Sequence, residues 1–192
     1  YAFRMQLAWP GEEVPFYGLV DATKYNMLVT NHGTIMIFWV AMPVLIAAFG
    51  NWMIPLMIGA PDMALPRMNN WSFWILPFAF TILIGSVVMS AFGAGNPSAP
   101  NFGWTFYAPL STKYGPASTD LFILSVHMMG ISSIMGAINV VVTVFNMRAP
   151  GMTLMKMPLF VWTWLITAFL LIAVIPVPVS YTHLTLPTNS SV

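Results

Sequence analysis

The chain has no cysteine and little charge: charged side chains make up 6% of its 192 residues. Without a thiol it can form no disulfide, no thiolate-ligated iron–sulfur or copper centre and no covalently attached c-type haem. The six basic residues stand singly, and the formal net charge is +1, so the charge pattern gives no support for a nucleic-acid partner. Hydrophobic residues make up 58% of the chain, which lies far outside the range of a soluble domain and indicates a membrane protein.

Four long apolar runs, at 31–58, 71–92, 120–147 and 158–177, account for this composition. Each has about the 20 residues that cross a hydrocarbon layer of about 30 Å. A segment in lipid must satisfy its backbone polar groups internally, so each run predicts a transmembrane helix. Pro43 and Pro55 interrupt the first run, where a kink is more usual than a helix end. The predicted fold is an all-α, multi-pass membrane protein with about four transmembrane helices.

The two ends of the chain differ from its middle. Tyr1 is not an initiator methionine and no signal peptide is recognisable, so we expect an internal piece of a longer protein. After residue 177 the sequence turns polar and Thr-rich without helical periodicity, and residues 179–188 look like the in-frame translation of a sequencing adapter. We therefore expect native sequence over 1–177 and a non-native tail over 178–192, in which Tyr181 and His183 have no role. An ordinary loop is the alternative.

Two histidines, His32 and His127, lie within the apolar runs. An ionisable side chain inside a spanning segment is costly and marks a candidate site, and histidine is a common axial ligand of haem iron. From the residues alone, His32 is either such a ligand or a histidine that hydrogen-bonds a neighbouring helix, and for His127 the second reading is favoured. A bis-histidine cytochrome would need a second ligand along the same helix, and His32 has none. A haem-free transporter or structural membrane protein would explain the apolar runs equally well.

Two long motifs carry a family resemblance. The sequence YNMLVTNHGTIMIF at 25–38, followed by FGNWMIPLMIGAPDMALPRMNN at 49–70, closely resembles helix two and the next loop of subunit I of the haem-copper terminal oxidases. The likeness continues through 103–107, 127–139, 146–152 and 158–162, and so covers nearly all of the chain before the tail. It implies a piece of a twelve-helix bundle, from the end of helix one through most of helix five.

The resemblance implies roles for individual positions. His32 corresponds to an axial ligand of the low-spin haem, while His127 corresponds to no metal ligand. Arg4 corresponds to the residue that hydrogen-bonds the formyl group of haem A, and Trp104 to a residue near a haem propionate; both are otherwise interfacial side chains. Asp62 corresponds to the entrance of the D proton channel. The polar groups along the water-filled path beyond it are Asn51, Asn69, Ser72, Ser132, Ser133 and Asn139.

Helical spacing agrees with these roles. His32 and Asn51 are 19 positions apart in the first run, which corresponds to about 28 Å at 1.5 Å per residue, nearly the hydrocarbon thickness. The haem ligand and the proton entrance are therefore expected near opposite membrane surfaces. Asn and Ser suit a water-filled path, because they hold waters without trapping charge, but a lone Ser in a membrane helix often bonds its own carbonyl four residues back.

The implied activity is reduction of oxygen to water with proton pumping, in the respiratory chain of a bacterial plasma membrane or a mitochondrial inner membrane. Pro61 resembles the members that oxidise cytochrome c, whereas quinol-oxidising relatives often have Arg there. The implied partners are oxidase subunits II and III, cytochrome c, oxygen and lipid. The ligands of the high-spin haem and of copper B belong to later helices, so we expect no catalytic residue in this piece and no activity from it alone.

Overall fold

The computed structural model describes residues 1–15, 18–92, 99–113 and 118–177. Within these residues every secondary-structure element is a helix, apart from one isolated β-bridge between Val14 and Gly18. This confirms the all-α prediction. The expected tail at 178–192 lies outside the described residues. The chain divides into two compact units, one made of Tyr1–Ile37 and Thr81–Leu124 and the other of Phe38–Phe80 and Ser125–Val192.

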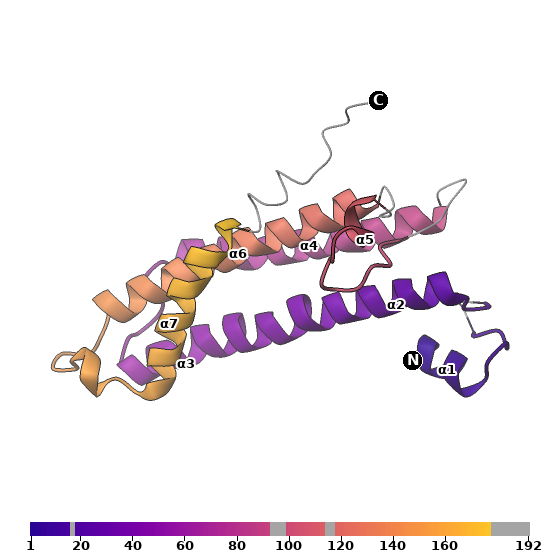
Figure 1. Ribbon diagram of the computed structural model, residues 1–192. Coiled ribbons are helices and arrows are strands. Elements are labelled where there is room, and N and C mark those ends of the chain that lie inside the picture. The colour runs from indigo at the N-terminus through magenta and orange to yellow at the C-terminus, as the bar shows by residue number, and fades with distance from the viewer. Residues whose placement is uncertain (16–17, 93–98, 114–117, 178–192) are drawn as a thin grey trace, which may run out of the picture. The chain divides into compact units, whose positions relative to one another are not determined.

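The first apolar run forms part of a helical run over Ala22–Ile58, shown in Figure 1 between the labels α2 and α3. It consists of α2 (Ala22–Thr34), two π-helical stretches (η1, Ile35–Ala41, and η2, Pro43–Gly50) and α3 (Asn51–Ile58). Proline removes a backbone N–H from the helical ladder, and π-type turns are one way in which a membrane helix accommodates this loss. Helical structure passes through both prolines, as the sequence predicts.

The other long helices are α4 (Pro66–Phe92) and α6 (Thr119–Asn146). Among the described residues, the helices long and apolar enough to span a membrane are Ala22–Ile58, Pro66–Val88 and Thr119–Asn146. The fourth predicted span is shorter: α7 covers Leu159–Val174, 16 residues, or about 24 Å. The helix ends at Val174, just before Ile175 and Pro176, although Ile175 itself keeps helical backbone angles, φ = −60° and ψ = −36°.

The first unit also contains α1 (Ala2–Ala8), which packs against α2, and α5 (Leu110–Lys113). Asp21 caps α2 by accepting a hydrogen bond from the Lys24 backbone N–H at 2.7 Å. Three aromatic rings, those of Phe102, Phe106 and Phe122, pack together, with centroids 5.2 Å apart for the first two and 4.7 Å for the last two. Phe122 is fully buried, so this cluster anchors the segment around residues 102–106 to α6.

The core of the second unit lies where α3, α6 and α7 meet (Figure 1). Ile54, Ile58, Val144 and Val161 are fully buried there. A short 3₁₀ helix, η3 (Leu154–Lys156), precedes α7. This core fixes the end of α3 against the end of α6, and so determines where the loop that leaves α3 begins.

Candidate functional site

The loop from α3 to α4 carries Asp62. It begins at Gly59, which ends α3 in the left-handed conformation with φ = 75°, a conformation that glycine adopts without steric cost. Asp62 is exposed, and its Oδ1 accepts a hydrogen bond from the Met63 backbone N–H at 2.7 Å. Pro66 begins α4, a favoured first helical residue because it has no N–H to leave unsatisfied. Glycine, aspartate and proline therefore shape the loop locally.

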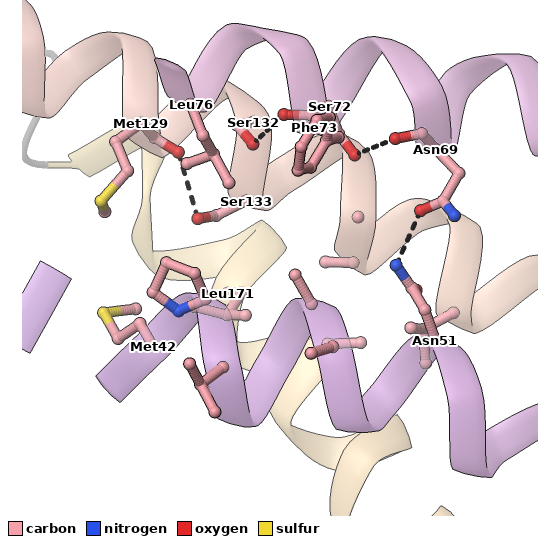
Figure 2. A pocket seen from close by; sticks show the side chains of 18 of the residues that line it. Met42, Asn51, Asn69, Ser72, Phe73, Leu76, Met129, Ser132, Ser133 and Leu171 are labelled. Atoms are coloured by element: carbon pink, nitrogen blue, oxygen red, sulfur yellow. Dashed lines mark hydrogen bonds between the residues drawn. The ribbon is translucent and has the colours of Figure 1, made fainter. Parts of the chain in front are cut away.

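A cavity of about 620 Å³ lies beside this loop in the second unit, and Figure 2 shows it from close by. Its walls are mostly apolar, with Phe38, Met42, Leu76 and Leu171 among them. Six of the seven residues that the resemblance assigns to a proton path line it together: Asn51, Asp62, Asn69, Ser72, Ser132 and Ser133. The structure thus gathers side chains from α3, the loop, α4 and α6 around one space.

Hydrogen bonds join the helices across this space (Figure 2). Asn51 Nδ2 on α3 donates to Asn69 Oδ1 on α4 at 2.9 Å. Ser132 Oγ on α6 donates to the backbone oxygen of Ser72 on α4 at 2.6 Å, and Ser72 Oγ donates to the Asn69 backbone oxygen at 2.7 Å. Because these two serine protons bind carbonyls, the hydroxyl oxygens keep lone pairs that can accept further hydrogen bonds. The polar wall of the cavity therefore presents acceptors at serine and both donors and acceptors at asparagine.

Ser133 and Asn139 differ from the other members of the set. Ser133 Oγ donates to the Met129 backbone oxygen on its own helix at 3.1 Å, so taken alone it is weak evidence for a polar path. Asn139 is not among the residues that line the cavity. It is fully buried, and its Oδ1 accepts a hydrogen bond from the Leu65 backbone N–H at 2.9 Å. Its Nδ2 is buried with no hydrogen-bond partner within the part of the chain that the structure describes.

His32 belongs to the first unit, on α2. The imidazole is on an exposed face, between exposed Val29 one turn before it and exposed Met36 one turn after it. The next residue, Gly33, faces Trp104, since a Cβ placed there would lie 3.4 Å from Trp104 Cδ1. The structure therefore brings Trp104 to the turn of helix that carries His32. An imidazole at an open apolar surface could hold the iron of a haem, for which histidine nitrogen is a common ligand.

Arg4 and His127 lie elsewhere. Arg4 is exposed on α1. His127, on α6, is half-buried and lines a second, mostly apolar cavity of about 240 Å³ in the second unit. Among the described residues no group of three or more His, Cys, Asp or Glu side chains is placed to hold a metal ion.

Two buried threonines were missed by sequence reasoning. Thr30 Oγ1 donates to the Asn26 backbone oxygen and accepts the Gly103 N–H at 2.9 Å, beside Trp104. Thr143 Oγ1 makes the equivalent pair of bonds near Asp62, accepting the Ala64 N–H at 2.9 Å. The donated bonds, each to the carbonyl four residues back, are common for threonine in a helix, so no sequence signal distinguishes these two from other threonines.

Comparison with known proteins identifies the family. The family model described as Cytochrome C and Quinol oxidase polypeptide I matches residues 1–191. The chain belongs to this family. Cytochrome c oxidase subunit 1 of Cereibacter sphaeroides is 47% identical over 153 residues, which are 80% of this chain and 27% of that relative. The resemblance to haem-copper oxidase subunit I is thereby confirmed, and the chain spans about a quarter of the length of the curated relative.

Membership in this oxidase family also decides between the kinds of membrane protein that the apolar runs and histidines left open. The family is a membrane-embedded helical bundle of haem- and copper-binding proteins, and the long apolar helices Ala22–Ile58, Pro66–Val88 and Thr119–Asn146 agree with it. A haem-free transporter and a bis-histidine cytochrome of another fold no longer account for the chain.

Proposed function

We propose that the chain is part of the catalytic subunit of cytochrome c oxidase, which reduces oxygen to water and pumps protons across its membrane. The observation that carries this proposal is the 620 Å³ cavity, at which six separately predicted polar side chains from four segments meet. A packed membrane core would bury apolar groups at these positions, because buried polar groups without partners are costly. A space lined by Asn and Ser can instead hold a chain of hydrogen-bonded waters.

In this proposal Asp62 collects protons from water at the membrane surface. Its carboxylate is exposed yet lines the cavity, so it can exchange protons with bulk solvent and pass them to waters inside. Asn51 and Asn69, joined by their 2.9 Å hydrogen bond, would form the first polar contact beyond it, followed by Ser72 and Ser132. Asn139 would act on the backbone of the loop rather than on the waters of the path.

His32 would hold the iron of the low-spin haem, which supplies one-electron transfer towards the oxygen-reducing centre. Its exposed imidazole, the open apolar face around it and the nearby Trp104 support this role. Haem A is the proposed haem, with Arg4 at its formyl group and Trp104 near a propionate. His32 lies on the same helical run as Asn51, on the far side of the π-helical stretches.

Cytochrome c is the proposed electron donor, in keeping with Pro61 and with the name of the similar Cereibacter sphaeroides protein. Subunits II and III are the proposed partners, in a bacterial plasma membrane or a mitochondrial inner membrane. The high-spin haem and copper B would be held by parts of the subunit beyond this chain, so the chain alone is expected to be inactive.

We also propose that residues 178–192 are a non-native tail, from their polar, aperiodic sequence. The family match, however, extends to residue 191 and so includes this segment. Sequencing the parent gene from genomic DNA across residue 177 provides a direct test: continuation of the apolar run supports a foreign tail, and the same Thr-rich sequence would show that it is native.

The function is tested by Asp62→Asn in the full-length enzyme, sealed in vesicles. Oxygen consumption and proton release should both fall by about tenfold or more, since a positioned proton-transfer group typically contributes about 10²–10⁴-fold. Haem content should stay unchanged. Asp120→Asn is the matched control, because it removes an exposed carboxylate from the first turn of α6. Normal turnover and a normal proton-to-electron ratio in Asp62→Asn would leave Asp62 as an ordinary loop carboxylate and refute the channel.

A further inference from the structure

The loop backbone after Asp62 has an unusual set of hydrogen bonds. Three consecutive residues, Met63, Ala64 and Leu65, present N–H groups, and the next residue, Pro66, has none. All three N–H groups are bound by side-chain oxygens rather than by backbone carbonyls. Asp62 binds the first of them itself. The other two are bound by a helix more than 70 residues away in sequence, which is not required by any local rule for starting a helix.

Thr143 and Asn139, one turn apart on α6, provide those two oxygens. Thr143 Oγ1 accepts the Ala64 N–H at 2.9 Å and Asn139 Oδ1 accepts the Leu65 N–H at 2.9 Å. Thr143 Oγ1 also donates to the Asn139 backbone oxygen at 2.6 Å. This donated bond fixes the hydroxyl proton on the helix side, so that a lone pair must point at the loop. Both side chains are fully buried, so water does not compete for these bonds.

These bonds bear on Asp62 because its own side chain is exposed and bonds the adjacent backbone. Its position at the cavity therefore follows from the position of the loop backbone. Met63, which is 2% exposed, anchors the loop by packing, but packing alone does not fix the rotation of a peptide plane. The bond from Ala64 to Thr143 does fix it, two residues from the carboxylate.

We propose that Thr143 is a positioning residue for the proton entrance: its hydroxyl holds the Asp62 loop against α6 and so keeps the carboxylate at the mouth of the cavity. This inference rests on the proposed function of Asp62 as proton collector. Thr143 itself does not line the cavity and contributes no group to the proton path.

The test uses Thr143→Val in the full-length enzyme in vesicles, since valine keeps the shape and removes the hydroxyl. Turnover and proton uptake should fall by up to about tenfold, less than the about 100-fold that a 1 Å misplacement of a reacting group can cost. The KM for cytochrome c and the haem spectrum should not change. Thr143→Ser, which restores the hydroxyl, should recover most of the rate.

Thr167→Val is the matched control. Thr167 Oγ1 donates to the Thr163 backbone oxygen at 2.8 Å, four residues back, as Thr143 does to Asn139. Among the described residues, no hydrogen bond joins Thr167 to the Asp62 loop. Its rate should equal that of the wild type. If the valine variant fails to assemble with haem, Thr143→Ala repeats the test. Alanine also removes the hydroxyl, but it places no methyl group against the Ala64 N–H.

The double variant Asp62→Asn/Thr143→Val separates positioning from general damage. If Thr143 acts through Asp62, adding Thr143→Val to Asp62→Asn should slow turnover no further, because effects of residues that act as a unit are not additive. Additive slowing, a normal rate in Thr143→Val and Thr143→Ala, or no recovery in Thr143→Ser would each overturn the proposal. A normal rate in Asp62→Asn would refute the channel itself, whereas a slow Asp62→Asn beside a normal Thr143→Val refutes the positioning role alone.

Discussion

Replacing Gly59 with alanine should destabilise the loop that carries Asp62 by two separable effects. Gly59 has φ = 75°, and left-handed backbone costs a residue with a Cβ about 1–2 kcal/mol. In addition, the new Cβ would lie 3.0 Å from the Ala149 Cβ. Ala149 cannot easily move away, because its N–H donates to the Ile58 backbone oxygen at 2.8 Å. Crowding of this kind costs about 1–3 kcal/mol, so Gly59→Ala should lose about 2–5 kcal/mol in all.

Two further variants divide this loss. Gly151 has φ = 86° and no atom within 4 Å of an added Cβ, so Gly151→Ala should show the backbone cost alone, about 1–2 kcal/mol. Gly59→Ala combined with Ala149→Gly removes the methyl group that causes the crowding, and should recover part of the loss.

The assay is thermal denaturation of the detergent-solubilised full-length protein, followed by circular dichroism. The midpoint should be lowest for Gly59→Ala, higher for Gly59→Ala/Ala149→Gly and for Gly151→Ala, and highest for the wild type. If Gly59→Ala denatures no earlier than Gly151→Ala, the close approach of residues 59 and 149 is not a stability determinant and the reasoning fails.

The two membrane histidines give the remaining predictions. His32→Ala in the full-length enzyme should abolish the low-spin haem band in a reduced-minus-oxidised spectrum, because the variant removes the proposed ligand of the iron; an intact band would contradict the ligand assignment. His127→Ala should leave both haem signals in place, since the resemblance gives this side chain no role as a metal ligand and it lines the second, mostly apolar cavity. Loss of either signal would show that His127 contributes to a haem site.

The helices were largely predictable, but their ends were not. The apolar run at 31–58 predicted the first long helix, but in the structure this helix starts nine residues earlier, at Ala22. The apolar run at 71–92 predicted the next one, which starts at Pro66. An apolar run marks the part of a helix that crosses hydrocarbon, and a helix continues into the polar region as long as its backbone groups find partners. Asp21 as a cap and Pro66 as a first residue were the available signals for the true starts.

The residues of the candidate site came from the motifs, and their arrangement came from packing. Asp62, Asn69 and Ser72 lie close together in sequence, so a shared location for them could be expected. That Ser132 and Ser133 face the same cavity depends on the rotation of α6 against α4. The motif set also included Asn139, which lies on α6 but does not line the cavity. It is about one and a half turns beyond Ser133, and at that height its side chain meets the backbone of the Asp62 loop.

By itself the sequence determined that this is a helical membrane protein, which family it belongs to and which polar residues stand out in its apolar runs. Composition and the length of the apolar runs suffice to identify a helical membrane protein, because only helices and closed barrels can span a bilayer. Tertiary structure alone decided which group of the loop Thr143 binds. Its donated hydrogen bond to the carbonyl four residues back follows from helix geometry and is shared by other threonines such as Thr167. Its accepted bond, from Ala64 at a separation of 79 residues, exists because the packing of α3 against α6 brings that loop to its lone pair, and no local pattern encodes such a meeting.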